Sequence, residues 1–158
     1  MPTHEQAPSA WIGSDAGSRD ARFHPADMRV ERVIEGGPEA SAEARSTVSE
    51  MDAGLGWRSE DARIVVTELT TNAWKHGHAR DSRPIRLTVE YRDGGLRMEI
   101  HDQGPGFDAL DRPRGRGPDQ AGWGLRIVRG LADAWGVRRS PSGTCVWALI
   151  RPREAPEA

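Results

Sequence analysis

The chain has 158 residues, with 22 Lys and Arg against 24 Asp and Glu and a formal net charge of −2. This length predicts one compact domain, and the balanced charge excludes a global basic field that would attract nucleic acid or an anionic membrane. Cys145 is the only cysteine, which excludes an internal disulfide, and no stretch approaches the roughly 18 apolar residues of a membrane span. We therefore expect a soluble, cytoplasmic protein that binds neither nucleic acid directly nor a membrane.

The first third of the chain predicts a disordered tail, an edge strand and a helix. Residues 1–22 are rich in Ala, Ser, Gly, Pro and charge without periodicity, and the same holds for 152–158, so the folded domain is expected at 23–151. Mixed β-branched and charged residues favour an edge strand within 23–35. A first helix is then indicated by apolar residues at steps of four, three and four, namely Ala44, Val48, Met51 and Leu55, broken by Gly54 and Gly56.

The middle of the chain predicts a second helix followed by a β-hairpin. Ser59 is placed as the N-cap of this helix, and Gly77 is placed to stop it. Two alternating runs, 85–91 and 96–100, flank Asp93-Gly94-Gly95, which is typical of a hairpin. One face of the hairpin is apolar and the other polar, which indicates an antiparallel sheet with helices on one side. The second helix is expected to bury Ala62, Val65, Val66, Leu69 and Ala73.

The last third predicts a loop, a third helix and a second hairpin. Residues 108–121 show no core pattern and are expected to form a mobile loop or lid. The helix is expected from about Gly124 through Trp135, with Gly136 at its C′ position, and the runs 137–140 and 144–151 then form the hairpin. The predicted fold class is α+β, a two-layer α/β sandwich with a mostly antiparallel sheet and helices on one face.

Three polar segments stand out against this framework. The first lies on the second helix, where Glu68, Asn72, Lys75 and His76 share one stripe beside the apolar stripe. Lys75 is the only lysine of the chain and offers a compact, mobile charge suited to a phosphate. Taken alone, this stripe also fits an ordinary polar helix face.

The second and third segments place glycines beside a carboxylate and beside a helix start. Asp102 ends a predicted strand and is followed by Gly104 and Gly106, so its carboxylate can accept a hydrogen bond from an exocyclic amine such as that of adenine. Gly122, Gly124 and Leu125 open the third helix, whose free N–H groups form an anion site. A strand-ending turn and a plain loop-to-helix junction are the alternatives for each segment alone. The chain contains neither a Walker P-loop nor a Rossmann glycine motif.

Together these segments, Glu68-Leu-Thr-Thr-Asn72, Asp102-Gln-Gly104-Pro-Gly106 and Gly122-Trp-Gly124-Leu125, resemble the Bergerat ATP-binding fold of histidine kinases, DNA gyrase, heat-shock 90 chaperones and mismatch-repair proteins. The sequence is most similar in size and helix order to the stand-alone anti-sigma factor serine kinases. The resemblance covers about residues 25–151. It implies that Glu68 is the general base and Asn72 the Mg²⁺ ligand. It also implies an adenine-reading Asp102 with turn glycines Gly104 and Gly106, and phosphate-contacting Gly122 and Gly124.

This resemblance implies a phosphoryl transfer from Mg-ATP. Lys75 and lid arginines would offset charge on the γ-phosphate, with His76 and Leu125 lining the same groove. The expected acceptor is a serine on an anti-anti-sigma (STAS) partner, and a sigma factor is the expected target of sequestration. A homodimer is usual in this group. The arginines of 108–121 also fit a solvated loop.

Three alternatives differ in what they require. An ATP-gated binding module without kinase activity would share the same nucleotide site and differ only in whether a hydroxyl reaches Glu68. A sensor histidine kinase would need a dimerisation helix pair with a phospho-accepting histidine, which residues 1–22 do not provide. A chaperone or topoisomerase-like ATPase would need further domains, which we do not expect at this length.

Overall fold

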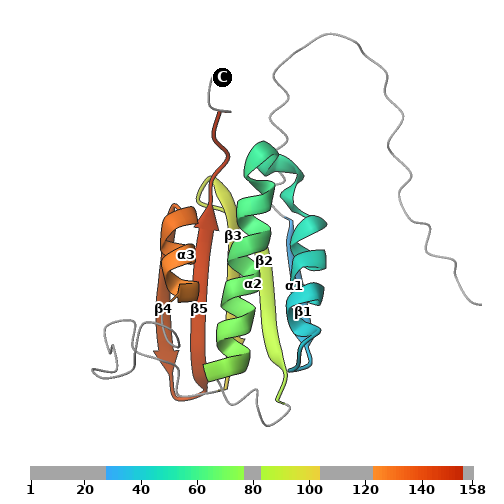
Figure 1. Ribbon diagram of the computed structural model, residues 1–158, viewed down its shortest axis with the longest axis vertical. Coiled ribbons are helices and arrows are strands. Elements are labelled where there is room, and N and C mark those ends of the chain that lie inside the picture. The colour runs from blue at the N-terminus through green and yellow to red at the C-terminus, as the bar shows by residue number, and fades with distance from the viewer. Residues whose placement is uncertain (1–27, 77–82, 104–122, 155–158) are drawn as a thin grey trace, which may run out of the picture.

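The computed structural model describes residues 28–76, 83–103 and 123–154. They form one antiparallel sheet of five strands in the order β1-β2-β3-β5-β4, with the helices on a single face (Figure 1). The elements in chain order are β1 Arg29–Ile34, α1 Ala40–Ser49, the 3₁₀ helix η1 Asp52–Arg58, α2 Ser59–His76, β2 Ile85–Arg92, β3 Gly95–Asp102, α3 Trp123–Leu131, β4 Ala134–Ser140 and β5 Gly143–Ile150. The predicted fold class and the edge position of the first strand are confirmed.

The core lies between the helical layer and one face of the sheet. Strand residues that alternate in sequence, such as Leu96, Met98 and Ile100, are fully buried on that face. The apolar stripe predicted for α2 packs against them, and all five of its predicted members are buried. Because successive side chains of a strand point to opposite faces of the sheet, the residues between these core positions lie on the face that no helix covers. None of the helices in the described ranges is both long and apolar enough to cross a bilayer.

The predicted β2–β3 hairpin is confirmed together with its turn. Arg92 pairs with Gly95, so the connecting loop contains only Asp93 and Gly94. Both residues have positive φ, 55° and 76°, which is the backbone of a type I′ turn and matches the right-handed twist of the strands. The loop sequence therefore fixes the register that sets Asp102 at the end of β3.

The first predicted helix is shorter than its apolar spacing indicated. α1 ends at Ser49, and Met51 and Leu55 are buried from the segment that follows, Leu55 as part of η1. Gly56 interrupts helical geometry with φ 58° and ψ −127°. The spacing could not reveal this break, because an α-helix and a 3₁₀ turn bury residues at nearly the same steps.

The predicted N-cap role of Ser59 is wrong. Ser59 already has helical dihedrals as the first residue of α2. Its hydroxyl donates a hydrogen bond of 2.9 Å to the carbonyl oxygen of Asp52, which links the start of α2 to the start of η1. Arg63 makes a second link, because its Nε donates to the Asp52 carboxylate at 2.8 Å.

The third helix also ends earlier than predicted. α3 stops at Leu131, whereas Trp135 and Gly136 belong to β4. The Asp133 N–H donates to the carbonyl of Leu149 at 2.9 Å, so the chain joins the sheet two residues after the helix. Position 136 does not end a helix. Glycine is favoured there because a Cβ would lie 2.9 Å from the indole nitrogen of Trp147.

Candidate functional site

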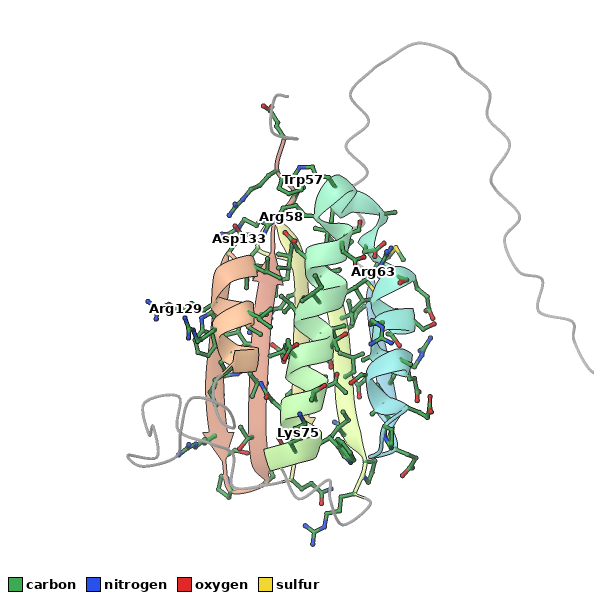
Figure 2. All side chains as sticks on the ribbon, in the orientation of Figure 1. Trp57, Arg58, Arg63, Lys75, Arg129 and Asp133 are labelled. Carbon is green, nitrogen blue, oxygen red and sulfur yellow. The ribbon has the colours of Figure 1, made fainter. Side chains whose placement is uncertain are left out.

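The polar stripe of α2 lies on the half of the helix nearer its C-terminal end. Glu68 and Asn72 are half-buried and Lys75 is exposed. Figure 2 shows Lys75 near the C-terminal end of α2, which is the end toward which β3 also runs in Figure 1. His76 is the last residue of α2; its side chain lies outside the described part of the chain.

Gly124 brings the third segment against the first. It is the second residue of α3, and a Cβ built on it would lie 2.6 Å from Oε2 of Glu68. The same Cβ would lie 3.2 Å from both Oδ1 and Nδ2 of Asn72. Because Gly124 has no side chain, the start of α3 packs closely against these two polar groups. Two segments more than fifty residues apart in sequence are thus in contact at the positions that the sequence singled out.

Asp102 occupies the end of β3 on the helix-covered face. It continues the alternation of Met98 and Ile100 and is only 8% exposed. Thr144 of β5 is its partner in the strand register and is also buried. The β4–β5 turn passes close to this position, because a Cβ on Gly143 would lie 1.9 Å from the carbonyl oxygen of Asp102. Gly143 has φ 138°, so both space and backbone geometry favour glycine there.

A cavity of about 650 Å³ opens along the strand ends around Asp102. Its lining comes from the ends of all five strands and includes Val33, Ile85, Arg86, Asp102, Arg139 and Thr144. Glu68 and Asn72 are not among its lining residues; they pack against Gly124 instead. Leu125 is half-buried on α3. The predicted phosphate and turn glycines Gly104, Gly106 and Gly122 lie outside the described residues.

An ion-pair network fixes α3 against the start of α2. The buried Arg58 guanidinium donates to the carbonyl of Leu131, the last residue of α3, and to the Asp133 carboxylate at 2.6 Å. Figure 2 shows Arg58 and Asp133 side by side at the end of the molecule away from Lys75. Burial alone would raise the pKa of Asp133, but hydrogen bonds from the Arg151 N–H, Arg153 and Arg58 outweigh it and lower that pKa. These bonds hold the C-terminal end of α3 in place and so help to position Gly124 at its N-terminal end.

Sequence reasoning missed Thr144 and Gly143 as members of this neighbourhood. The sequence pattern predicts Gly143 only as a turn residue and Thr144 only as the start of a strand. Register pairing supplies the missing signal, since the residue opposite a strand-ending Asp lies within side-chain reach. The alternation of β5 sets Thr144 on the same face as the core residue Val146.

The donor groups suit a phosphate ester and a hard cation. A carboxylate at position 68 can accept a proton, and the amide oxygen of Asn72 is a ligand type that Mg²⁺ accepts. Gly124 lies in the N-terminal turn of α3, where backbone N–H groups have no intrahelical partner and can bind an anion. These features define a nucleotide-binding α+β domain as the class of protein to which the fold and the site belong.

The chain belongs to the histidine kinase-like ATPase domain family, whose model matches residues 34–150. Among curated proteins it is similar to a serine-protein kinase, RsbW, of Bacillus licheniformis, with 28% identity over 111 residues, 61% of this chain and 69% of that protein. It is also similar to the anti-sigma F factor of Shouchella clausii, with 36% identity over 75 residues, 45% of this chain and 51% of that relative. The resemblance to the anti-sigma kinase group stated from the sequence is thereby confirmed.

A solved structure shows the same fold. The crystal structure of the RsbU and RsbW domains of a Mycobacterium tuberculosis protein superposes with a TM-score of 0.59 at 20% identity, covering 78% of this chain and 32% of that chain. At this identity the likeness establishes the architecture of the domain. The chain spans about half the length of the anti-sigma F factor and a third of the mycobacterial protein.

Proposed function

We propose that this protein is an ATP-binding anti-sigma regulatory factor with serine protein kinase activity. Its substrate would be a serine of an anti-anti-sigma (STAS) partner, and its regulatory target a sigma factor. The observation that carries the proposal is the packing of Gly124 against Glu68 and Asn72, because it unites a base, an amide ligand and a helix N-terminus in one place. The names of the relatives in Bacillus licheniformis and Shouchella clausii support the same activity class.

The residues have separate roles in the proposed transfer. Asp102 accepts a hydrogen bond from the exocyclic amine of adenine, and Thr144, its register partner, adds a hydroxyl next to it. Gly124 lets phosphate oxygens approach the N-terminal N–H groups of α3. Mg²⁺, held by Asn72 and the phosphates, would neutralise charge on the transferred group.

Glu68 serves as the proton acceptor in the proposed reaction. The serine oxygen of the partner forms a bond to the γ-phosphorus while the bond to the β–γ bridging oxygen breaks, giving phosphoserine and ADP. Glu68 orients the serine hydroxyl and takes its proton. Lys75, exposed at the end of the same helix, offsets charge on the γ-phosphate.

The test is a transfer assay with the full chain, Mg-ATP and its anti-anti-sigma partner, read as phosphoserine by mass. Glu68→Gln is expected to lower transfer roughly 100-fold or more while nucleotide affinity stays within a few-fold. Asp102→Asn is expected to weaken nucleotide binding itself. Glu60→Gln is the matched control, because Glu60 is on the same helix with a side chain 70% exposed.

Two results would contradict parts of the proposal. Unchanged ATP affinity in the Asp102→Asn variant would overturn the nucleotide site. Intact ATP binding without any transfer to the partner would overturn the kinase activity and favour an ATP-gated module that sequesters the sigma factor.

A further inference from the structure

The open face of the sheet carries a cluster of three metal-ligating side chains that the proposed kinase does not use. Glu99 and His101 lie two residues apart on β3 and therefore share a face. Cys145 of β5 is the register partner of His101, which brings their side chains together from adjacent strands. The alternation that buries Ile100 and Val146 in the core turns these three side chains to the face without helices.

The distances between the three ligating atoms are close to those between the ligands of one metal ion. Nε2 of His101 lies 3.1 Å from Oε2 of Glu99 and 3.6 Å from Sγ of Cys145. The third edge, from Sγ of Cys145 to Oε2 of Glu99, is 3.7 Å. Tetrahedral zinc, with bonds of about 2.0–2.1 Å to nitrogen or oxygen and about 2.3 Å to sulfur, places its ligands roughly 3.3–3.6 Å apart. The three observed distances, 3.1, 3.6 and 3.7 Å, lie within about 0.2 Å of this range.

We propose that Glu99, His101 and Cys145 form a three-ligand binding site for a divalent cation of the zinc class, with a water as the fourth ligand. One thiolate, one imidazole and one carboxylate are a ligand set that suits Zn²⁺ over Mg²⁺ or Ca²⁺. His101 and Cys145 line the cavity at the strand ends, which gives the ion and its water access from solvent. Within the described residues this is the group of His, Cys, Asp and Glu side chains that comes close enough to share an ion.

Arg97 orients the carboxylate for this role. Its Nε donates to Oε1 of Glu99 at 2.7 Å, and its guanidinium stacks on the Trp147 ring at 4.0 Å from the centroid. Arg97 thus holds Oε1, and Oε2 is the carboxylate oxygen within reach of His101 and Cys145. Hydrogen bonds of this kind, made to a ligand rather than to the ion, position metal ligands in proteins.

Arg138 competes with the ion and makes the site sensitive to substitution. Its Nη2 lies 3.0 and 3.1 Å from Oε2 and Oε1 of Glu99 and 3.5 Å from Sγ of Cys145, so it covers the position that a cation would take. The Arg138 side chain is 59% exposed on edge strand β4 and can turn outward into solvent. Metal binding therefore requires this guanidinium to leave, and removal of the arginine is expected to tighten binding.

The experiment titrates the tag-free, full-length protein, first stripped with a chelator, with Co²⁺ as a spectroscopic probe and then displaces the Co²⁺ with Zn²⁺. One equivalent of Co²⁺ is expected to give a thiolate-to-cobalt charge-transfer band and the intense visible bands of tetrahedral cobalt. Cys145→Ser is expected to abolish the charge-transfer band, and both Cys145→Ser and His101→Ala are expected to lower affinity roughly 100-fold. Circular dichroism establishes that each variant is folded. Because His101 is half-exposed, His101→Ala keeps the test valid even if the Cys145→Ser protein does not fold.

Arg138→Gln and Arg92→Gln form a matched pair of charge-removing variants, because Arg92 is at the far end of β2, is not among the residues that line the cavity, and has a side chain 63% exposed. Arg138→Gln is expected to raise the affinity for Zn²⁺ several-fold, whereas Arg92→Gln leaves it unchanged. Cobalt bound without a charge-transfer band, equal affinity in the Cys145→Ser and wild-type proteins, or no binding at micromolar Co²⁺ would each overturn the proposal. None of these results depends on ATP, so a failure here is distinct from a failure of the proposed kinase activity.

Discussion

At the scale of single residues, Gly124 is the position where the start of α3 packs directly against the polar side chains of α2. Gly124→Ala would push a methyl group to 2.6 Å from the Glu68 carboxylate and 3.2 Å from the Asn72 amide. Both are the ends of side chains that can move, so we expect the fold to survive. The displaced groups would no longer meet the nucleotide correctly, and transfer is expected to fall roughly 10- to 100-fold. Phosphate transfer and nucleotide affinity, measured together, check this expectation.

Gly130→Ala is the control for this substitution. Gly130 lies on the same helix and is exposed, and a Cβ added to it would have no atom within 4 Å. Alanine there should stabilise α3 by up to about 1 kcal/mol through helix propensity and leave transfer unchanged. Equal activity of the Gly124→Ala and wild-type proteins would show that the close packing at Gly124 is not needed for transfer.

Asp133 provides a second prediction at the scale of one residue. Asp133→Asn takes a carboxylate from the buried Arg58 and is expected to lower the free energy of unfolding by roughly 3 kcal/mol at neutral pH. The folded-state pKa of Asp133 is lowered from the ordinary value of 3.8 by its hydrogen bonds from Arg151, Arg153 and Arg58, which outweigh burial. A lowered pKa means that its stabilisation is present above the unfolded pKa and is lost as the pH falls through the folded one.

Urea unfolding of the wild-type and Asp133→Asn proteins at pH 7, 5 and below 4 measures this effect. The difference in unfolding free energy should be constant between pH 7 and 5 and should shrink below about pH 4. Asp93→Asn is the control, since Asp93 is in an exposed turn and pairs only loosely with Arg92 at 3.8 Å. A difference that is the same at the lowest pH would show that the Asp133 charge is not the source.

At the scale of elements, the sequence predicted best where a local rule decides the backbone. The Asp93-Gly94 turn and the alternation on both sides of it predicted β2 and β3, and the spacing of buried residues predicted α2. The sequence predicted the ends of elements poorly where a tertiary contact determines them. The end of α3 depends on Arg58, 73 residues away, and on the bond from Asp133 to β5, and no local pattern contains that information.

The candidate site divides in the same way. Helix periodicity and a glycine at a helix start are local features, and they singled out Glu68, Asn72 and Gly124 as candidates; the resemblance to the ATP-binding fold supplied their expected roles. That Gly124 meets the other two is a tertiary fact. The cluster around Cys145 could be found only from the strand register. That register pairs residues 44 positions apart, and no short sequence motif contains this information.

The type I′ turn gives a prediction about an element. Gly94→Ala keeps the contacts of the hairpin, because no atom lies within 4 Å of the added Cβ, but forces alanine to φ 76°. We expect a loss of about 1 kcal/mol in unfolding free energy. Gly94→Asn should cost less, since asparagine tolerates this backbone region. Equal stability of all three proteins in chemical denaturation would contradict the turn assignment.

At the scale of the whole molecule, one core unites all the described elements. The sheet packs its helices on a single face, so the proposed nucleotide site lies on the helical side and the proposed metal site on the open side. They share β3, where His101 and Asp102 are adjacent residues turned to opposite faces. A single core between the sheet and its one layer of helices favours one cooperative unfolding transition.

Because the domain is expected to unfold as one unit, a ligand bound at one end stabilises all of it. Mg-ATP at about 100 times its dissociation constant should add about 2.7 kcal/mol to the free energy of unfolding, which for a domain of this size raises the midpoint by roughly 5–10 °C. Calorimetry should show one transition that moves as a whole, and the Glu68→Gln protein should shift equally because it still binds. The Asp102→Asn protein should shift little. A wild-type midpoint that Mg-ATP does not move, or two transitions of which one moves, would mean that the nucleotide does not bind the folded core that the strands and helices build together.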